Sequence, residues 1–324
     1  MKNYNWATLG CGVIANQLAA AMQKEGRKLY SVANRTHAKA VEFAEKYGIE
    51  KVYDHIDDVF EDENVDIIYI STPHNTHISY LRKALSSGKH VICEKSITLN
   101  IEELQEAYDL AKEHNVVLAE AMTIFHMPLY KKLHELAESG RLGDLRMIQM
   151  NFGSYKEYDM NNRFFNPSLA GGALLDIGVY ALSCVRWFMS EKPDHILSQV
   201  KLAPSGVDEQ AGILLMNPAN EMATISLTLH AKQPKRGMAA FDKGYIEVYE
   251  YPRADKAVVT FTEDGHQEII EAGKTEDALR YEIRDMERAV AQESNDMHFD
   301  YTYDVMSMMT EIRKSWNLYY PEEQ

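Results

Sequence analysis

The feature that most constrains the fold is a glycine turn in the segment Ala7-Thr8-Leu9-Gly10-Cys11-Gly12-Val13-Ile14-Ala15. A short apolar run leads into the turn, and an Ala/Leu/Met-rich helical pattern follows it. Gly10 suits a tight turn, Gly12 lets a pyrophosphate approach the backbone, and Ala15 lets the helix pack close to the strand. The free N–H groups at the helix start, in particular those of Val13 and Ile14, attract phosphates. The pattern is typical of a dinucleotide-binding strand–turn–helix unit.

Strand and helix patterns alternate through the first third of the chain. Apolar strand patterns are followed by amphipathic helix patterns, and this alternation favours a parallel sheet with helices on both faces. We predict strands at residues 29–33, 65–72, 90–93 and 116–121, and helices at 41–47, 78–86 and 101–114. The sequence therefore predicts an α/β, doubly wound Rossmann domain over residues 1–122.

The second strand is followed by Asn34, Arg35 and Thr36. In a dinucleotide-binding domain an acidic residue here would bind the ribose 2′-hydroxyl and select NAD, whereas an arginine suits a 2′-phosphate. This favours NADP as the cofactor, with NAD as the alternative. The simpler interpretation is that Arg35 is a solvated side chain at a helix start.

Two loops follow later strands of the predicted sheet. Ligands of such sheets bind beyond the carboxyl ends of the strands, so we expect these loops to line the cofactor crevice; their candidate residues are Thr72, Pro73, His74, Asn75, His77 and Glu94-Lys95. The two histidines lack the spacing of a zinc site, and no metal site is predicted. We expect His77 to cap the next helix. Lys95 is expected to point toward the nicotinamide and the substrate, the alternative being a surface lysine paired with Glu94.

The pattern changes after residue 122. Alternating apolar and polar residues predict consecutive strands without helices between them, and hence a large, open, mostly antiparallel sheet. The predicted strands lie at residues 148–152, 200–202, 207–216, 223–230, 245–251 and 256–261. We predict an α+β substrate-binding and dimerisation domain over residues 123–324, with closing helices at 275–292 and 304–318. The last helix is a candidate for packing back on the first domain. Helices cover one face of the sheet, and the open face favours a homodimer.

A glycine-rich segment, residues 166–180, lies between the predicted strands. Asp176 and Tyr180 are four residues apart, so they share one face of a helix that starts near Gly172. We expect Gly171 and Gly172 to leave room for a ligand above this face. The alternative is a structural hydrogen bond between Asp176 and Tyr180.

Charge and cysteine content limit the partners. The formal net charge of −15 without a basic patch argues against nucleic acid and anionic membranes. Three widely spaced cysteines, Cys11, Cys93 and Cys184, suggest reduced thiols and a cytoplasmic location. We find no apolar run that we expect to cross a bilayer, and the early first strand predicts no signal peptide.

Taken together, these motifs resemble the glucose–fructose oxidoreductase/inositol dehydrogenase (Gfo/Idh/MocA) family. The resemblance rests on Gly10-x-Gly12-x-x-Ala15, Thr72-Pro73 with His77, Glu94-Lys95, and the segment from Gly171 to Tyr180, in that order. Tyr180 stands where inositol dehydrogenases carry histidine, which is similar to the dimeric dihydrodiol dehydrogenase branch. That branch implies NADP and pairing through the open sheet.

The resemblance implies that Lys95, Asp176 and Tyr180 are catalytic and that Arg163 reaches the cofactor or the substrate. It further implies hydride transfer between the nicotinamide and a hydroxyl-bearing carbon of a sugar, polyol or cyclic diol. Ser96 replaces the family's usual proline, and we therefore expect a trans Lys95–Ser96 peptide bond.

The proton carrier stays open. A tyrosine with its ordinary pKa of about 10 is a poor base unless a cation such as Lys95 favours the phenolate. Tyr180 can exchange the proton with Lys95 tuning it, or Lys95 can itself be the acid/base. Two alternatives to a dehydrogenase remain: a non-catalytic NADP(H)-binding sensor or regulatory protein, and a family member with tightly bound cofactor that performs elimination or glycoside cleavage by transient oxidation.

Overall fold

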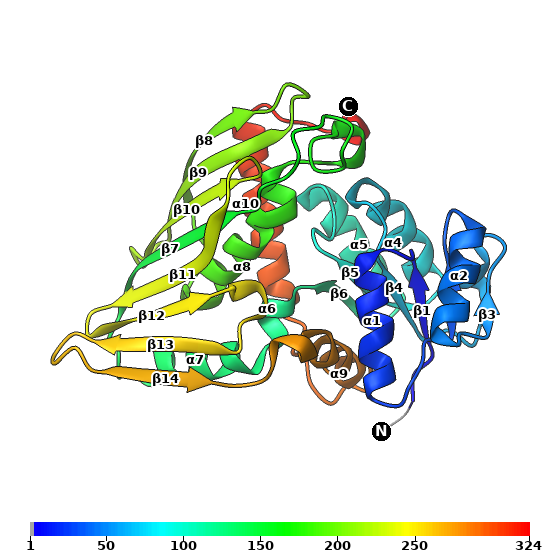
Figure 1. Ribbon diagram of the computed structural model, residues 1–324, viewed down its shortest axis with the longest axis horizontal. Helices are drawn as coiled ribbons and strands as arrows, with labels where there is room; N and C mark the ends of the chain where they lie inside the picture. The colour runs from blue at the N-terminus through cyan, green and yellow to red at the C-terminus, as the bar shows by residue number, and fades with distance from the viewer. Residues whose placement is uncertain (1–2) are drawn as a thin grey trace. The chain divides into compact units, whose positions relative to one another are not determined.

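The computed structural model describes residues 3–324 (Figure 1). The chain forms two compact units. The first comprises residues up to Thr98, Glu102–Met122 and Leu279–Phe299; the second comprises Leu99–Ile101, Thr123–Ala278 and Asp300–Gln324. One passage of the chain between the units thus falls between residues 122 and 123, where the sequence places a domain boundary.

The first unit is built on a six-stranded parallel sheet, which confirms the predicted Rossmann fold. The strand order is β3-β2-β1-β4-β5-β6, the order of doubly wound dinucleotide-binding domains. The strands are β1 (Trp6–Leu9), β2 (Ser31–Ala33), β3 (Lys51–Val52), β4 (Ile67–Ile70), β5 (His90–Glu94) and β6 (Leu118–Ala121). The helices that follow them are α1 (Val13–Lys24), α2 (His37–Tyr47), α3 (Asp58–Glu61), α4 (His77–Ser86) and α5 (Ile101–Glu113).

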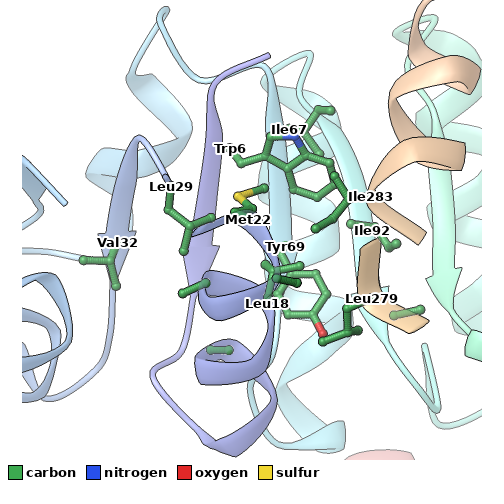
Figure 2. Packing of buried hydrophobic residues seen from close by; sticks show 14 of the residues in the cluster. Trp6, Leu18, Met22, Leu29, Val32, Ile67, Tyr69, Ile92, Leu279 and Ile283 are labelled. Carbon is green, nitrogen blue, oxygen red and sulfur yellow. The ribbon is translucent and has the colours of Figure 1, made fainter. Parts of the chain in front are cut away.

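A helix from much later in the chain completes the core of this unit. Helix α9 (Ala278–Val290) contributes Leu279 and Ile283 to the same buried cluster as Trp6 and Ile92 (Figure 2). The indole N–H of Trp6 donates a 2.8 Å hydrogen bond to Glu287. The sequence pattern predicts this helix but not the sheet that it covers. Helix α10 (Phe299–Ser315) belongs, apart from its first residue, to the second unit; its docking on the first domain stays a prediction.

The second unit contains an eight-stranded sheet of order β14-β13-β12-β11-β7-β10-β9-β8. The predicted mostly antiparallel sheet is confirmed, and β7–β10 is its parallel pair. Its strands are β7 (Leu145–Gly153), β8 (His195–Leu202), β9 (Asp208–Met216), β10 (Met222–Thr228), β11 (Gln233–Phe241), β12 (Gly244–Tyr249), β13 (Lys256–Phe261) and β14 (Gln267–Glu271).

Strands β3, β11 and β14 are not among the strands predicted from the sequence. Strand β3 has only two residues, and β14 is a polar edge strand. Strand β11 contains Pro234 and Lys235, which weaken a strand pattern. Both lie where the β11–β7 register shifts, and such an irregularity accommodates a residue that lacks a backbone N–H.

Helices lie on one face of this sheet, as predicted, and in the part of the chain drawn in Figure 1 the other face carries none. The covering helices are α6 (Thr123–His126), α7 (Pro128–Glu138), α8 (Val179–Phe188) and α10. The stretch Pro167–Phe188 is long and apolar enough by length and composition to span a membrane, contrary to our expectation from the sequence. Of its apolar 18-residue window, 83% is buried inside the protein, as in core helices of soluble proteins.

Candidate active site

The glycine turn after β1 has the geometry that a phosphate requires. Gly10 has a φ of +102°, and an added Cβ would lie 2.8 Å from the carbonyl oxygen of Ser71, so this position demands glycine. An added Cβ on Gly12 would meet no atom within 4 Å. Gly12 is also the N-cap of α1 and brings no side chain to its first N–H groups. The residues present therefore fit a bound pyrophosphate at the start of α1.

The turn after β2 is open to solvent. Asn34 donates a 3.0 Å hydrogen bond to the Thr36 carbonyl, and the side chain of Arg35 is exposed. Strands β1 and β2 are neighbours in the sheet, and the Gly10 amide donates to the Ala33 carbonyl at 2.9 Å. The two turns thus leave adjacent strands at the same edge of the sheet.

His77 does not cap α4 as we expected. No side chain caps this helix, and the imidazole is completely buried. Its Nε2 lies 2.9 Å from the Thr72 carbonyl oxygen, and its Nδ1 lies 3.0 Å from that of Ser96 and 3.2 Å from that of Ile97. Burial lowers the pKa of His77, while these carbonyl groups act in the opposite direction. His77 therefore joins the loop after β4 to the loop after β5.

The Lys95–Ser96 peptide bond is cis, which corrects our expectation of a trans bond. Hydrogen bonds hold the backbone on both sides of it. His74 donates through Nε2 to the Lys95 carbonyl at 3.0 Å, and the Ile97 amide donates to the buried Glu120 carboxylate at 3.0 Å. The Lys95 side chain is half-buried at the end of β5.

In the second unit, Asp176 lies on the first turn of the helical segment and Tyr180 on the next. The first turn, Leu174–Gly178, is π-helical and runs directly into α8. The expectation that Gly171 and Gly172 leave room for a ligand is wrong. An added Cβ would lie 2.8 Å from the Arg163 carbonyl oxygen at Gly171 and 2.1 Å from an Asp208 oxygen at Gly172. Both glycines are therefore required by close packing within the protein.

Arg163, another predicted site residue, lies close to a carboxylate of this helix. Its Nη2 lies 3.8 Å from Oδ1 of Asp176, and its guanidinium stacks 4.1 Å from the centroid of the Phe164 ring. The guanidinium is largely exposed, whereas the Asp176 side chain is mostly buried. This arrangement leaves Arg163 donors available to an anionic or hydroxyl-bearing ligand.

The structure thus gathers the predicted residues in two groups, one in each unit. Contacts or shared turns join Gly10, Gly12, Thr72, His74, His77 and Lys95 in the first unit, and Arg163, Asp176 and Tyr180 in the second. Asp208 and Tyr320 contact the glycine segment and were not predicted as site residues. Asp208 stands at the start of a strand next to a second carboxylate, Glu209, and no local pattern marks it as buried. Among residues 3–324, no group of three or more His, Cys, Asp or Glu side chains could hold a metal ion.

A doubly wound sheet with an open glycine turn at the carboxyl end of β1 defines a dinucleotide-binding protein. Family comparison gives the particular class. Residues 4–122 match the oxidoreductase family with an NAD-binding Rossmann fold (Gfo/Idh/MocA), and residues 130–249 match the Gfo/Idh/MocA C-terminal domain. The chain belongs to the Gfo/Idh/MocA family and is an NAD(P)-dependent oxidoreductase.

A curated relative agrees with this assignment, and two solved structures share the fold. Trans-1,2-dihydrobenzene-1,2-diol dehydrogenase of Xenopus tropicalis is 30% identical over 247 residues, covering 75% of this chain and 74% of that protein. A levoglucosan dehydrogenase in complex with NADH has a TM-score of 0.88 at 20% identity and 97% coverage of both chains. KijD10, a 3-ketoreductase from Actinomadura kijaniata in complex with NADP and TDP-benzene, has a TM-score of 0.86 at 18% identity, covering 97% of this chain and 98% of that one.

Proposed function

We propose that this protein is an NADP(H)-dependent dehydrogenase or reductase acting on a hydroxyl-bearing carbon of a sugar, polyol or cyclic diol. The cofactor assignment rests on Gly12, where a Cβ would meet no atom within 4 Å. Phosphate oxygens need this space to approach the backbone N–H groups at the start of α1. The substrate class is supported by the names of the relatives, which act on a diol, an anhydrosugar and a keto group. When bound, the nicotinamide accepts or donates the hydride.

The preference for NADP rests on Arg35. It is exposed at the end of β2, where the neighbouring residues Asn34 and Thr36 are uncharged. A guanidinium binds a 2′-phosphate well and gains little from a 2′-hydroxyl. We expect Arg35→Ala to weaken NADPH binding about tenfold and NADH binding less than about twofold. Titration by nucleotide fluorescence measures both, with Lys28→Ala as an exposed control. Equal losses for the two nucleotides would exclude 2′-phosphate recognition by Arg35.

Lys95, Asp176 and Tyr180 are the residues to which we assign proton chemistry. Removal of a hydride from an alcohol requires that the hydroxyl proton leave, and both Lys95 and Tyr180 carry a group that can exchange it. Asp176 accepts hydrogen bonds and can orient a neighbouring hydroxyl of a polyol or diol. Arg163, whose Nη2 lies 3.8 Å from Oδ1 of Asp176, can orient this carboxylate.

Turnover is the direct test. The purified protein is incubated with NADP⁺ or NAD⁺ and trans-1,2-dihydrobenzene-1,2-diol, levoglucosan, glucose or inositol, and NAD(P)H is followed by absorbance. We expect Tyr180→Phe and Lys95→Met each to slow the hydride step by at least about a hundredfold. Tyr319→Phe and Lys83→Met serve as controls, because both side chains are exposed. A Tyr180→Phe enzyme with nearly full rate would remove Tyr180 from the mechanism.

Cofactor release separates the alternatives. A non-catalytic sensor would bind NADPH and turn over none of these compounds. A protein that cleaves by transient oxidation would consume substrate without net release of NADPH. Either result would contradict the proposed dehydrogenase.

We further propose a homodimer through the open face of the eight-stranded sheet. Leu197, Tyr249 and Ile269 are exposed large apolar residues. Ile269 pairs with Val258, which alternates with the buried Ala257 and Val259, so Ile269 points to the open face. We expect a dimer by sedimentation equilibrium and a monomer in the double variant Leu197→Glu/Ile269→Glu. Lys112→Glu on α5 is the charge-matched control; a dimer that persists in the double variant would contradict this interface.

The remaining partners follow from charge and cysteine state. Three free cysteines suit a reducing cytoplasm, and a net charge of −15 disfavours nucleic acid and anionic membranes. We propose a cytoplasmic protein whose partners are small molecules. Cell fractionation and retention on a DNA column at low salt test this; a membrane-bound or DNA-retained protein would contradict it.

A further inference from the structure

A buried carboxylate lies beneath the glycine segment of the second unit. Asp208, the first residue of β9, is completely buried. Its Oδ2 accepts a 2.6 Å hydrogen bond from the amide of Leu174, the first residue of the π-helical turn. Its Oδ1 has no hydrogen-bond partner among the described residues, and it lies where a Cβ on Gly172 would stand. The carboxylate therefore packs directly against the backbone that enters the helix.

A second buried side chain holds the same backbone from the end of the described chain. The hydroxyl of Tyr320 donates a 2.7 Å hydrogen bond to the carbonyl of Gly171, and the ring is completely buried. Hydrogen bonds also fix the segment that contains Tyr320. The Glu323 carboxylate accepts a hydrogen bond from the Tyr320 amide at 2.8 Å. It accepts two more, each at 2.7 Å, from the terminal nitrogens of the buried Arg313.

These two contacts act at the start of the helix that carries the candidate catalytic residues. Asp176 and Tyr180 follow Leu174 by two and six residues. The first N–H groups of a helix lack partners within the helix, so an acceptor there both satisfies a donor and sets where the helix begins. Displacement of residues 171–174 would move both side chains.

We propose that Asp208 and Tyr320 are positioning residues, which clamp the Leu174 amide and the Gly171 carbonyl and thereby place Asp176 and Tyr180 for the reaction. Their link to turnover depends on the proposed function; the clamp itself does not. Neither residue belongs to the glycine turn or to the Arg35 region to which we assign cofactor binding. Loss of the clamp should therefore lower kcat and leave cofactor affinity unchanged.

The experiment uses the full chain and four variants. Asp208→Ala removes the acceptor, Asp208→Asn keeps a neutral acceptor of the same shape, and Tyr320→Phe removes only the hydroxyl. Tyr319→Phe is the matched control for the last, because its side chain is exposed one residue away. Hydrogen–deuterium exchange of peptides covering residues 171–178 reports the clamp without any substrate. Steady-state kinetics with NADP⁺ then reports its effect on turnover.

We expect Asp208→Ala and Tyr320→Phe to speed exchange in residues 171–178 by at least about fivefold, with strand β10 unchanged. Asp208→Asn at pH 6 and Tyr319→Phe should stay within about twofold of wild type. The kcat of the two loosened variants should fall about tenfold while the KM for NADP⁺ changes less than about twofold.

Each outcome decides a separate point. Exchange within twofold of wild type in Asp208→Ala excludes the clamp by Asp208, and the same result for Tyr320→Phe excludes Tyr320. Equally fast exchange in Asp208→Ala and Asp208→Asn would show that the hydrogen bond from the Leu174 amide does not hold this backbone in place, which contradicts the clamp by Asp208. If Asp208→Ala does not fold, Tyr320→Phe still tests the clamp through the Gly171 carbonyl. Faster exchange in a protein without turnover supports the clamp and refutes the proposed function.

Discussion

Nη2 of Arg163 lies 3.8 Å from Oδ1 of Asp176, which joins the loop after β7 to the helix that carries Tyr180. Sixty-one percent of the Arg163 side chain is exposed, so solvent screens the pair and its contribution to stability is small. The pair therefore adds little to the stability of the fold, and we propose that Arg163 acts at the site.

Replacing Arg163 separates these two roles. We expect Arg163→Ala to shift the thermal midpoint by less than about 2 °C and to lower kcat/KM by about tenfold, because Asp176 loses its orienting cation. Scanning fluorimetry and steady-state kinetics measure the two quantities. Arg141→Ala, which breaks a comparably exposed ion pair with Glu268, is the control and should leave kcat/KM unchanged. A large midpoint shift in Arg163→Ala would indicate a structural residue instead.

The two glycines of the first turn should respond differently to alanine. Gly10→Ala forces a Cβ against Ser71 at a φ of +102° and should lower the free energy of unfolding by about 2–4 kcal/mol. Gly12→Ala meets open space, so the free energy of unfolding should change by less than about 1 kcal/mol, while NADPH binding weakens about tenfold. Urea denaturation and nucleotide titration test both. An unimpaired Gly12→Ala would place the phosphates elsewhere.

His77 should contribute to stability although it lies in a motif of the candidate site. His77→Ala removes a buried ring that contacts three carbonyl groups, and we expect the free energy of unfolding to fall by about 2–4 kcal/mol. Exchange should increase in residues 72–77 and 95–97. His114→Ala, on an exposed histidine, is the control. A variant with unchanged stability and weaker NADPH binding would make His77 a direct ligand.

Asp208 should make stability depend on pH. Burial raises its pKa to about 7, against the lowering effects of the Leu174 amide and of Arg313; Tyr320 and Glu323 are the other titratable groups of the same network. Since the folded protein holds this proton more tightly than the unfolded chain, the contribution of Asp208 to stability is largest at low pH. It is lost as the pH rises through about 7.

The isosteric variant isolates this effect, because asparagine does not ionise. We expect the thermal midpoint of Asp208→Asn, relative to wild type, to increase by several degrees, about 3–6 °C, between pH 5 and pH 8. Asp194→Asn, an exposed carboxylate in the same unit, should show no such trend. A difference between Asp208→Asn and wild type that stays constant with pH would show that Asp208 is ionised throughout this range.

Local patterns in the sequence were sufficient to predict the glycine turn and the parallel sheet of the first unit. Gly10, Gly12 and Ala15 mark the dinucleotide turn because turn geometry, close approach and helix packing each require a small residue at a fixed spacing. The alternation of apolar strands and amphipathic helices gave the parallel sheet for the same reason, since periodicity is a property of neighbouring residues.

Contacts between distant segments decided the rest. The cis Lys95–Ser96 bond lies between a hydrogen bond that His74 donates to the Lys95 carbonyl and one that Glu120 accepts from the Ile97 amide. Gly172 is required by a carboxylate 36 residues later. Helix α9 shows an amphipathic pattern, yet only the tertiary structure shows that it covers the parallel sheet. Local sequence patterns indicate which residues are buried. Which residues they contact depends on the packing of segments far apart in the chain, and this was seen only in the tertiary structure.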